Sequence, residues 1–128
     1  MKVSRSQEDY LERILSLASQ KGDVRVTDLA TDMNISKPSV NKAIGLLKNQ
    51  GLVDHEKYGT LTLTPKGEAY AKNVEKRHTV LKRFLCDVLK VDEARAEEEA
   101  CAIEHGVSLD TIERLDRFLE EGLGGSKN

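Results

Sequence analysis

Tryptophan is absent from this sequence, and aromatic residues account for only 4% of its 128 residues. Any hydrophobic core must therefore consist mainly of leucine, isoleucine, valine and alanine. Only two cysteines are present, Cys86 and Cys101. Two cysteines do not support a disulfide-rich fold, and we expect both thiols to be reduced.

Long apolar runs are also missing. No segment approaches the ~20 consecutive apolar residues that span a bilayer. The first residues, MKVSRSQEDYLERI, lack the apolar centre of a signal peptide. We therefore expect a cytoplasmic protein without a membrane partner.

An excess of positive charge is lacking as well. The chain has 20 basic and 22 acidic residues, which gives a net charge of −2. Residues 1–70 hold 10 basic and 9 acidic groups, whereas residues 71–128 hold 10 and 13. This balance lacks the basic footprint of a constitutive nucleic-acid binder. DNA binding would then need a dimer or an added positive charge to strengthen it.

Helical periodicity dominates the first half of the chain. Residues 8–19 place their apolar side chains on one arc of a helix. A second helix is expected to start with Thr27 as its N-cap, and a third at about Ser36, ending at Gly51. The segment LVDHEKYGTLTLT then predicts a two-stranded hairpin that bends at residues 58–59. This order predicts a winged helix-turn-helix domain over residues 1–70.

The second half predicts helices only. Pro65 opens a long helix, and two more are expected over residues 92–105 and 108–121, the last with Ser108 as N-cap. The fold class is therefore mainly α, with three helices and a two-stranded wing followed by a helical domain over residues 71–128.

The third predicted helix and the hairpin tip carry candidate DNA-binding residues. Residues 36–50 contain three lysines and no acidic residue. In a winged helix-turn-helix, this helix enters the major groove and the hairpin lies on the backbone. Taken singly, each lysine could equally be a solvated surface residue. The candidates are Ser36, Lys37, Pro38, Ser39, Asn41, Lys42, Lys48, Lys57, Tyr58 and Thr60.

A second constellation, EACAIEH, brings three potential metal ligands close together. Helical spacing places Cys101, Glu104 and His105 on one acidic face, opposite Ala100 and Ile103. A buried cysteine normally behaves as a small apolar residue, so its place among carboxylates is unusual. A divalent cation would favour the thiolate there. The alternative is an ordinary solvated acidic face.

Three other residues could complete a metal site. Asp9 and Glu12 are one turn apart on the polar face of the first helix, and His78 falls in the apolar arc of the long helix. Each has an ordinary structural interpretation: the carboxylates as solvent-facing groups, the histidine as a hydrogen-bonded core residue.

These features together resemble one known family. EDYLERIL, a winged helix-turn-helix, RH in a long helix, and EACAIEH followed by SLDTIERL are similar to the diphtheria toxin repressor and manganese transport regulator family. The resemblance covers residues 6 to about 121. It implies a metal-dependent repressor that binds double-stranded operator DNA of metal-homeostasis genes as a homodimer and is not an enzyme.

The resemblance also implies a ligand set and a metal. The implied ligands are Asp9, Glu12, His78, Cys101, Glu104 and His105. Carboxylate oxygens suit Mn²⁺, while the softer Cys101 suits Fe²⁺, Co²⁺ or Zn²⁺. We therefore expect Mn²⁺ or Fe²⁺ as the cofactor, with Co²⁺, Zn²⁺, Ni²⁺ or Cd²⁺ able to bind in vitro.

Two departures from the iron-type members affect these expectations. Those members carry a glutamate four residues after the helix histidine, where this chain has Lys82. An ancillary metal site at His78 would then need a different shell, with Glu97 as a candidate. Because iron-type members also continue into a third domain, ending at Asn128 leads us to expect the two-domain layout.

We expect the metal ion to act by joining the two predicted domains. A cation held by the first helix and by the helical domain would fix the angle between domains, and so the spacing of two reading helices in a dimer. The main alternative is a winged-helix regulator that senses oxidants or small molecules through Cys101. Acidic neighbours argue against it, because reactive thiolates favour electropositive surroundings. A protein-interaction module is a third possibility, which the unopposed lysines of residues 36–50 disfavour.

Overall fold

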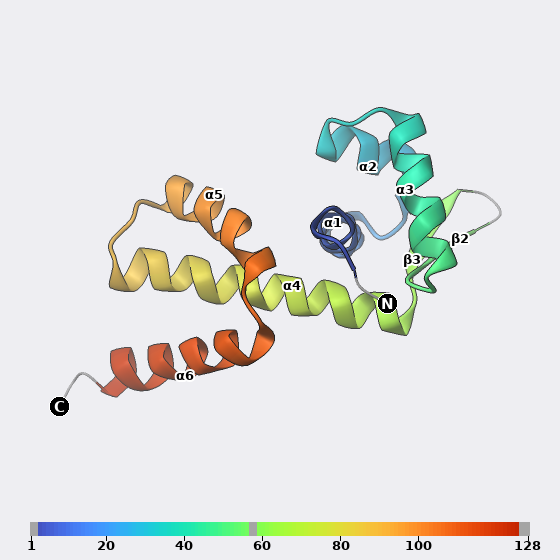
Figure 1. Ribbon diagram of the computed structural model, residues 1–128. Coiled ribbons are helices and arrows are strands. Elements are labelled where there is room, and N and C mark those ends of the chain that lie inside the picture. Colours follow the sequence, from blue (N-terminus) through green and yellow to red (C-terminus); the bar gives the residue numbers. More distant parts are fainter. Residues whose placement is uncertain (1–2, 57–58, 126–128) are drawn as a thin grey trace. The chain divides into compact units, whose positions relative to one another are not determined.

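The computed structural model describes residues 3–56 and 59–125. The chain divides into two units, Met1–Lys72 and Asn73–Asn128, and each unit has its own hydrophobic cluster. Helices predominate in both units (Figure 1). The predicted mainly α fold, with a winged helix-turn-helix before a helical part, is confirmed.

Helix α1 (Arg5–Lys21) begins at a capping box. The Ser4 hydroxyl accepts a hydrogen bond from the Gln7 backbone N–H at 3.1 Å, and the Gln7 side chain accepts one from the Ser4 N–H at 3.0 Å. These bonds satisfy two amide groups that a helix start would otherwise leave exposed. The helix buries Tyr10, Leu11 and Ile14.

Helices α2 (Val26–Met33) and α3 (Lys37–Asn49) form the helix-turn-helix pair. Asn34 takes the left-handed conformation that ends α2, with φ of 56°. Ser36 caps α3 as predicted. The prediction that Thr27 caps α2 is wrong, because Arg25 holds the cap position. The Asp28 carboxylate accepts the Arg25 backbone N–H at 2.8 Å and satisfies this helix start.

The sheet has one strand more than predicted. Strands β1 (Val24–Arg25), β2 (Val53–His55) and β3 (Thr60–Leu63) are antiparallel in the order β1-β3-β2. A two-residue strand is too short to show the alternation by which strands are predicted, so β1 was missed. Of the predicted bend at residues 58–59, Tyr58 lies outside the described part of the chain.

One hydrophobic cluster fills the first unit. Its most deeply buried members are spread over the helices, strands and loops of the unit: Leu11, Ile14, Val24, Leu29, Val40, Ile44, Leu47, Leu52, Val53, Leu61 and Ala71. The start of helix α4 (Pro65–Arg83) packs unusually close to this cluster. A Cβ built on Gly67 would lie 1.9 Å from the Leu52 carbonyl oxygen. Only glycine therefore fits at this point of α4.

The second unit contains the rest of α4, the π-helical turn η1 (Phe84–Val88), α5 (Glu93–Ile103), the 3-10 turn η2 (Glu104–Gly106) and α6 (Leu109–Gly125). Within this unit, α5 and α6 flank the second half of α4 (Figure 1). The core consists of Val80, Leu81, Leu85, Ala96, Ala100, Ile112 and Leu119. None of the helices in the described part of the chain combines the length and apolar character that a bilayer crossing requires.

Candidate metal centre and nucleic-acid interface

Helix α3 has one buried face and one open face. Val40, Ile44 and Leu47 are buried in the first unit. The exposed candidates for DNA contact are Ser36, Lys37, Pro38, Ser39, Asn41, Lys42 and Lys48. The absence of acidic residues from 36–50 leaves this face positively charged. A helix of this kind can approach a polyanion without meeting a like charge of its own.

Two of these candidates make hydrogen bonds within α3. The Ser36 hydroxyl accepts the Ser39 backbone N–H at 3.3 Å and lies 3.0 Å from the Ser39 hydroxyl. Of the hairpin candidates, Thr60 is half-buried in β3, where it pairs with Arg25. Lys57 and Tyr58 lie outside the described residues.

Helix α1 is joined to both helices of the pair by side-chain contacts. The Arg13 guanidinium binds the Asp32 carboxylate of α2 through two bonds of 2.7 and 2.9 Å. Near the start of α1, the Gln7 amide donates to Gln50, the C-cap of α3, at 2.8 Å. The predicted ligand Asp9 lies between these two contacts on α1. Side-chain hydrogen bonds therefore connect α1 to α2 and to the C-terminal end of α3.

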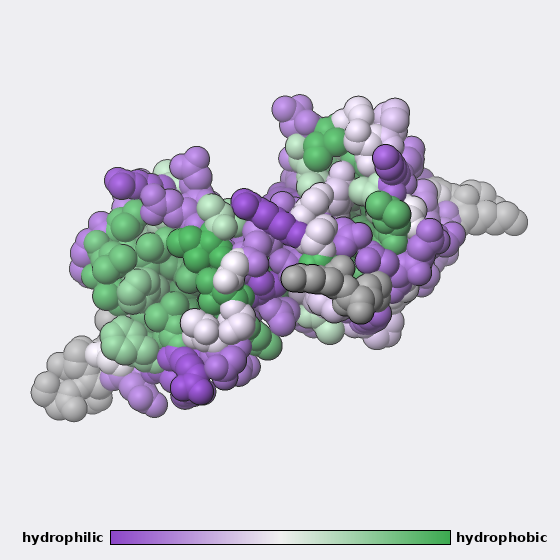
Figure 2. All heavy atoms as spheres, viewed as in Figure 1, coloured by the Kyte–Doolittle hydropathy of each residue, from purple (hydrophilic) through white to green (hydrophobic). Residues whose placement is uncertain are grey.

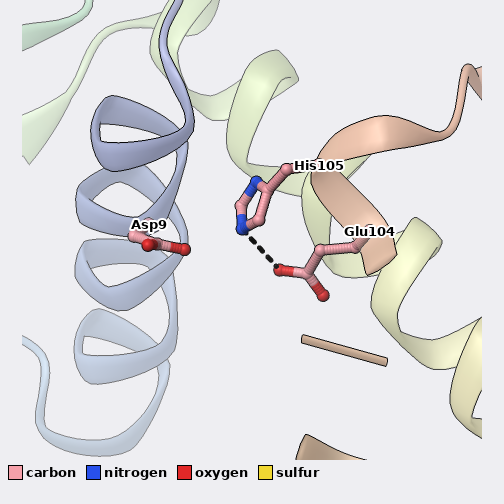
Figure 3. Close-up of side chains that lie close together, drawn as sticks. All are labelled: Asp9, Glu104 and His105. Atoms are coloured by element: carbon pink, nitrogen blue, oxygen red, sulfur yellow. Dashed lines mark ion pairs between the residues drawn. The ribbon is translucent and has the colours of Figure 1, made fainter. Parts of the chain in front are cut away.

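The two carboxylates predicted on α1 are half-buried. Asp9 and Glu12 are one helical turn apart, and Figure 3 labels Asp9 on this helix. Carboxylates spaced by three residues lie on the same side of a helix. The first unit therefore offers two neighbouring carboxylates, both half-buried, on one side of α1.

Glu104 is the centre of the polar cluster in the second unit. Its carboxylate is fully buried, which is rare for glutamate without a partner. Its Oε1 lies 2.7 Å from His78 Nδ1, and its Oε2 lies 3.4 Å from His105 Nε2 (Figure 3, dashed line). Among the described residues, no donor forms a hydrogen bond with Oε2. The structure thus brings together three of the predicted ligands.

The predicted acidic face of EACAIEH needs a correction. Glu104 does not share the exposed side of α5, because residues spaced by four, Ala96, Ala100 and Glu104, form one buried row. Ile103, predicted to face the core, is 40% exposed. Cys101 is exposed, so the thiol and the Glu104 carboxylate differ sharply in their surroundings.

Arg77 is a buried residue that the sequence interpretation missed. It is only 7% exposed, and its Nη1 donates to the backbone carbonyl of Glu104 at 2.6 Å and of Val107 at 3.4 Å. These carbonyls belong to the first residue of η2 and to the residue that follows η2, so Arg77 holds the turn that carries Glu104 and His105. Its place within the apolar arc of the long helix, between Val74 and Leu81, was the available signal.

His78 lies between two carboxylates. While Nδ1 faces Glu104, its Nε2 lies 2.9 Å from Glu97 Oε2. The hydrogen bond to Glu104, aided by the one to Glu97, raises the pKa of His78 to about 9 despite partial burial. In turn, the hydrogen bond from His78 lowers the pKa of Glu97. At neutral pH the imidazolium is therefore the positive group of this cluster.

A cavity adjoins this histidine within the second unit. It has a volume of about 390 Å³ and is lined by His78, Thr79, Lys82, Arg83, Cys86 and Glu97. The Lys82 ammonium lies 3.1 Å from Glu97 and 3.4 Å from Glu93. Glu97, predicted as an ancillary ligand, is therefore in contact with His78 and with a lysine.

The residues of the second unit fit a divalent cation. A buried carboxylate oxygen without a hydrogen-bond donor, next to an imidazole nitrogen, is costly unless a positive group neutralises it. Mixed oxygen and nitrogen donors suit Mn²⁺, Fe²⁺ and Zn²⁺. A metal ion would also remove the need for the proton that His78 carries.

Comparison with known families matches nearly the whole chain. Residues 2–61 match the family described as "Iron dependent repressor, N-terminal DNA binding domain". Residues 64–122 match "Iron dependent repressor, metal binding and dimerisation domain". The structure of the manganese regulator SloR is similar, with a TM-score of 0.78 and 32% identity. The match covers 93% of this chain and 54% of that one, so the chain spans about half of the solved relative.

Two curated relatives match over most of their length. A helix-turn-helix-type transcriptional regulator of Methanocaldococcus jannaschii is 40% identical over 120 residues, or 93% of this chain and 96% of the relative. The regulator MntR of Lysinibacillus sphaericus is 40% identical over 110 residues, or 86% and 78% of the two chains. The resemblance predicted from the sequence is thereby confirmed: the chain belongs to the iron-dependent repressor family of transcriptional regulators.

Proposed function

We propose that the chain represses metal-homeostasis genes by binding operator DNA as a homodimer when it carries Mn²⁺ or Fe²⁺. The observation that carries this proposal is the buried Glu104 carboxylate, whose Oε2 lies 3.4 Å from His105 Nε2 and has no hydrogen-bond donor among the described residues. In the metal-free protein the His78 imidazolium neutralises this carboxylate, and a bound divalent cation would do so in its place. The names of the relatives, a manganese regulator and MntR, support Mn²⁺.

The proposed ligands come from both units. Asp9 and Glu12 of α1 would supply carboxylate oxygens, and the second unit would supply the rest, His78, Cys101, Glu104 and His105. When bound, the ion supplies positive charge that offsets these acidic groups. The residues of α1 would then be held to the second unit, and the contacts of Gln7 and Arg13 would carry this constraint to α3 and α2.

The open face of α3 would bind the operator. Lys37, Lys42 and Lys48 would lie near phosphates, because lysine contacts with the backbone supply most of the affinity and little of the specificity. Asn41 is exposed between them and could reach a base edge. Neutralising acidic ligands makes the chain less negative, which further favours its approach to DNA.

The second unit would form the dimer. Figure 2 shows hydrophobic residues gathered on the visible face of this unit, and the exposed large apolar side chains among its described residues are Leu89, Ile103 and Phe118. A contiguous apolar patch on a protein surface often marks an interface with a partner. A second copy of the chain fits, since this region matches a dimerisation domain.

The protein would act in the cytoplasm as a regulator rather than an enzyme. Its polar cluster consists of the proposed ligands and of residues that contact them, while the exposed Cys101 lies on an acidic helix. Those surroundings disfavour the alternative of an oxidant sensor, since reactive thiolates need electropositive neighbours.

Operator binding in the presence and absence of metal tests the proposal. DNA retention should require Mn²⁺ or Fe²⁺ and should disappear with a chelator. The variant Glu104→Gln should fold but lose metal-dependent DNA binding, because it removes the charge that the ion neutralises. As a matched control, Glu113→Gln changes an exposed glutamate of α6 and should behave like the wild type. Strong operator binding by chelator-treated wild-type protein would contradict the proposal.

A further inference from the structure

The third turn of α3 presents an apolar side chain to solvent. Leu46 is 52% exposed, and in the part of the first unit that the structure describes it is the one large apolar side chain that lies open. A dimer formed through the second unit gives this leucine no partner. Single exposed leucines are common on protein surfaces, so Leu46 alone assigns no contact. Its neighbour in the sequence supplies a second observation.

Gly45 leaves the same turn of α3 without a side chain. It is exposed within the helix, and a Cβ built on it would meet no atom within 4 Å. The fold therefore has room for a side chain at this position, and alanine would make the helix more stable than glycine does. Packing within the chain does not account for this glycine. Close approach of another molecule to the helix backbone does.

Both residues lie on the open face of α3. Gly45 follows Asn41 by four positions, and Leu46 follows Lys42 by four, so each pair shares one side of the helix. This face also carries the lysines of residues 36–50, a segment without acidic residues. Its charge is complementary to a polyanion, which identifies duplex DNA as the molecule that covers the third turn.

The major groove offers an apolar group that a leucine can contact. Base edges there present hydrogen-bonding groups and the C5-methyl group of thymine, and apolar side chains contact this methyl group. The hydroxyls of the first turn are already engaged, since Ser36 accepts the Ser39 N–H at 3.3 Å and lies 3.0 Å from its hydroxyl. A side chain at residue 45 would hold the third turn away from the bases, because it would fill the space next to Leu46.

We propose that Leu46 contacts the C5-methyl group of a thymine in the operator, and that Gly45 is a positioning residue that lets the third turn of α3 come close enough for this contact. The inference rests on the proposed function and deepens it. The lysines of α3 supply affinity for phosphates, whereas Leu46 adds a preference for one base. Gly45 makes the helix less stable and the DNA contact possible.

Replacement of thymine by uracil tests the contact with Leu46. Full-length protein loaded with Mn²⁺ selects duplexes from a random pool, and each thymine of the selected duplex is replaced in turn by uracil, which lacks only the methyl group. With the wild type, one replacement in each half-site should lower the affinity about fourfold, the effect of one buried methyl group. With Leu46→Ala the same replacement should leave the affinity unchanged, because alanine is too short to reach the methyl group. Equal losses in the two proteins, or no loss at any thymine, would overturn the proposal.

Gly45→Ala separates a contact with DNA from a role in folding. This variant should unfold at a higher urea concentration than the wild type and yet bind the selected duplex about tenfold more weakly, as expected for an overpacked contact. Ser19→Ala is the matched control, since it improves helix propensity at an exposed position of α1 and should bind as the wild type does. Wild-type affinity in Gly45→Ala would refute the role of this glycine.

The same titrations distinguish this inference from the proposed function. Metal-dependent binding by the wild type, together with equal uracil losses in wild type and Leu46→Ala, would refute the thymine contact and leave the proposed function standing. Failure of the loaded wild type to bind any duplex would overturn both.

Discussion

The Arg77 guanidinium donates a hydrogen bond of 2.6 Å to the backbone carbonyl of Glu104, although 27 positions separate the two residues. This bond ties the middle of α4 to η2, the turn that positions Glu104 and His105. A backbone carbonyl at the end of α5 is satisfied at the same time, which a helix end requires. The buried carboxylate therefore depends on an arginine that has no direct place among the proposed ligands.

Replacing Arg77 should loosen this turn. We expect Arg77→Met to lower the free energy of unfolding by about 2–3 kcal/mol, because a hydrogen bond from a charged donor is lost and buried carbonyls stay unsatisfied. Urea unfolding followed by circular dichroism measures this change. Arg114→Met is the control, since Arg114 is exposed and pairs with Asp110 of its own helix. If Arg77→Met lowered the free energy of unfolding no more than the control, the bond between Arg77 and the Glu104 carbonyl would not stabilise the fold.

The charge of His78 predicts a pH dependence in the metal-free protein. Its pKa is raised to about 9 in the folded state, against about 6.5 when unfolded. The folded protein therefore binds this proton more tightly, and the resulting stabilisation is complete below pH of about 6.5 and is lost as the pH rises towards 9. With a chelator present, the free energy of unfolding should decrease across this range.

Two histidine variants isolate this effect. His78→Gln should remove most of the decrease between pH 6.5 and 9, while His55→Gln, which changes a histidine of β2 in the first unit, should retain it. The same proton competes with metal, so metal affinity should rise with pH over this interval. An unchanged pH profile in His78→Gln would mean that another group is responsible.

The close approach of Gly67 to Leu52 makes a prediction about the first unit. Any side chain at Gly67 would collide with the Leu52 carbonyl, so Gly67→Ala should destabilise by about 3 kcal/mol through forced backbone movement. Gly45→Ala is a matched control in α3, where a Cβ meets no atom within 4 Å. It should stabilise by about 0.5–1 kcal/mol, because alanine is the better helix former. Urea unfolding of both variants measures these free energies. An unchanged free energy of unfolding in Gly67→Ala would contradict the prediction.

The exposed apolar side chains of the second unit predict how the dimer can be disrupted. Phe118 is 53% exposed on α6. A charge there would have to be buried in the dimer, so Phe118→Asp should produce monomers in sedimentation experiments and weaken operator binding. Leu46→Asp places the same charge at an equally open leucine, 52% exposed, in α3. That variant should remain dimeric, and loss of the dimer in both would argue for general unfolding.

Local signals predicted the helix-turn-helix well. Ser36 before Pro38, followed by an apolar face of period 3.6, determines the start and orientation of α3 through local bonds alone, and the structure agrees. The two-residue β1 could not be foreseen, because its pairing partner Leu61 is 37 positions away from Val24. Thr27 was misjudged since Asp28 supplies the cap bond from inside the helix.

The polar cluster was only partly predictable. EACAIEH indicated which residue types could bind a metal ion. The spacing of Glu104 by four residues from Ala100 was a signal of its burial that the sequence interpretation missed, but the partners of its carboxylate could not be read from one helix. Residue 104 ends the buried row of α5, and two residues of α4 contact it there: Arg77 at its backbone carbonyl and His78 at its carboxylate. Contacts of that kind depend on tertiary packing, so no single-helix pattern contains them.

The hydroxyl of Ser36 is committed to closing the first turn of α3, where it holds the Ser39 amide and lies against the Ser39 hydroxyl. This hydroxyl is poorly suited to contact a base, because turning towards the DNA would break its bond to the Ser39 N–H and destabilise the first turn of α3. The choice of target must then fall on the longer side chains beyond that first turn. Substitutions further along α3 should therefore change the operator sequence that the protein prefers more readily than a substitution of Ser36.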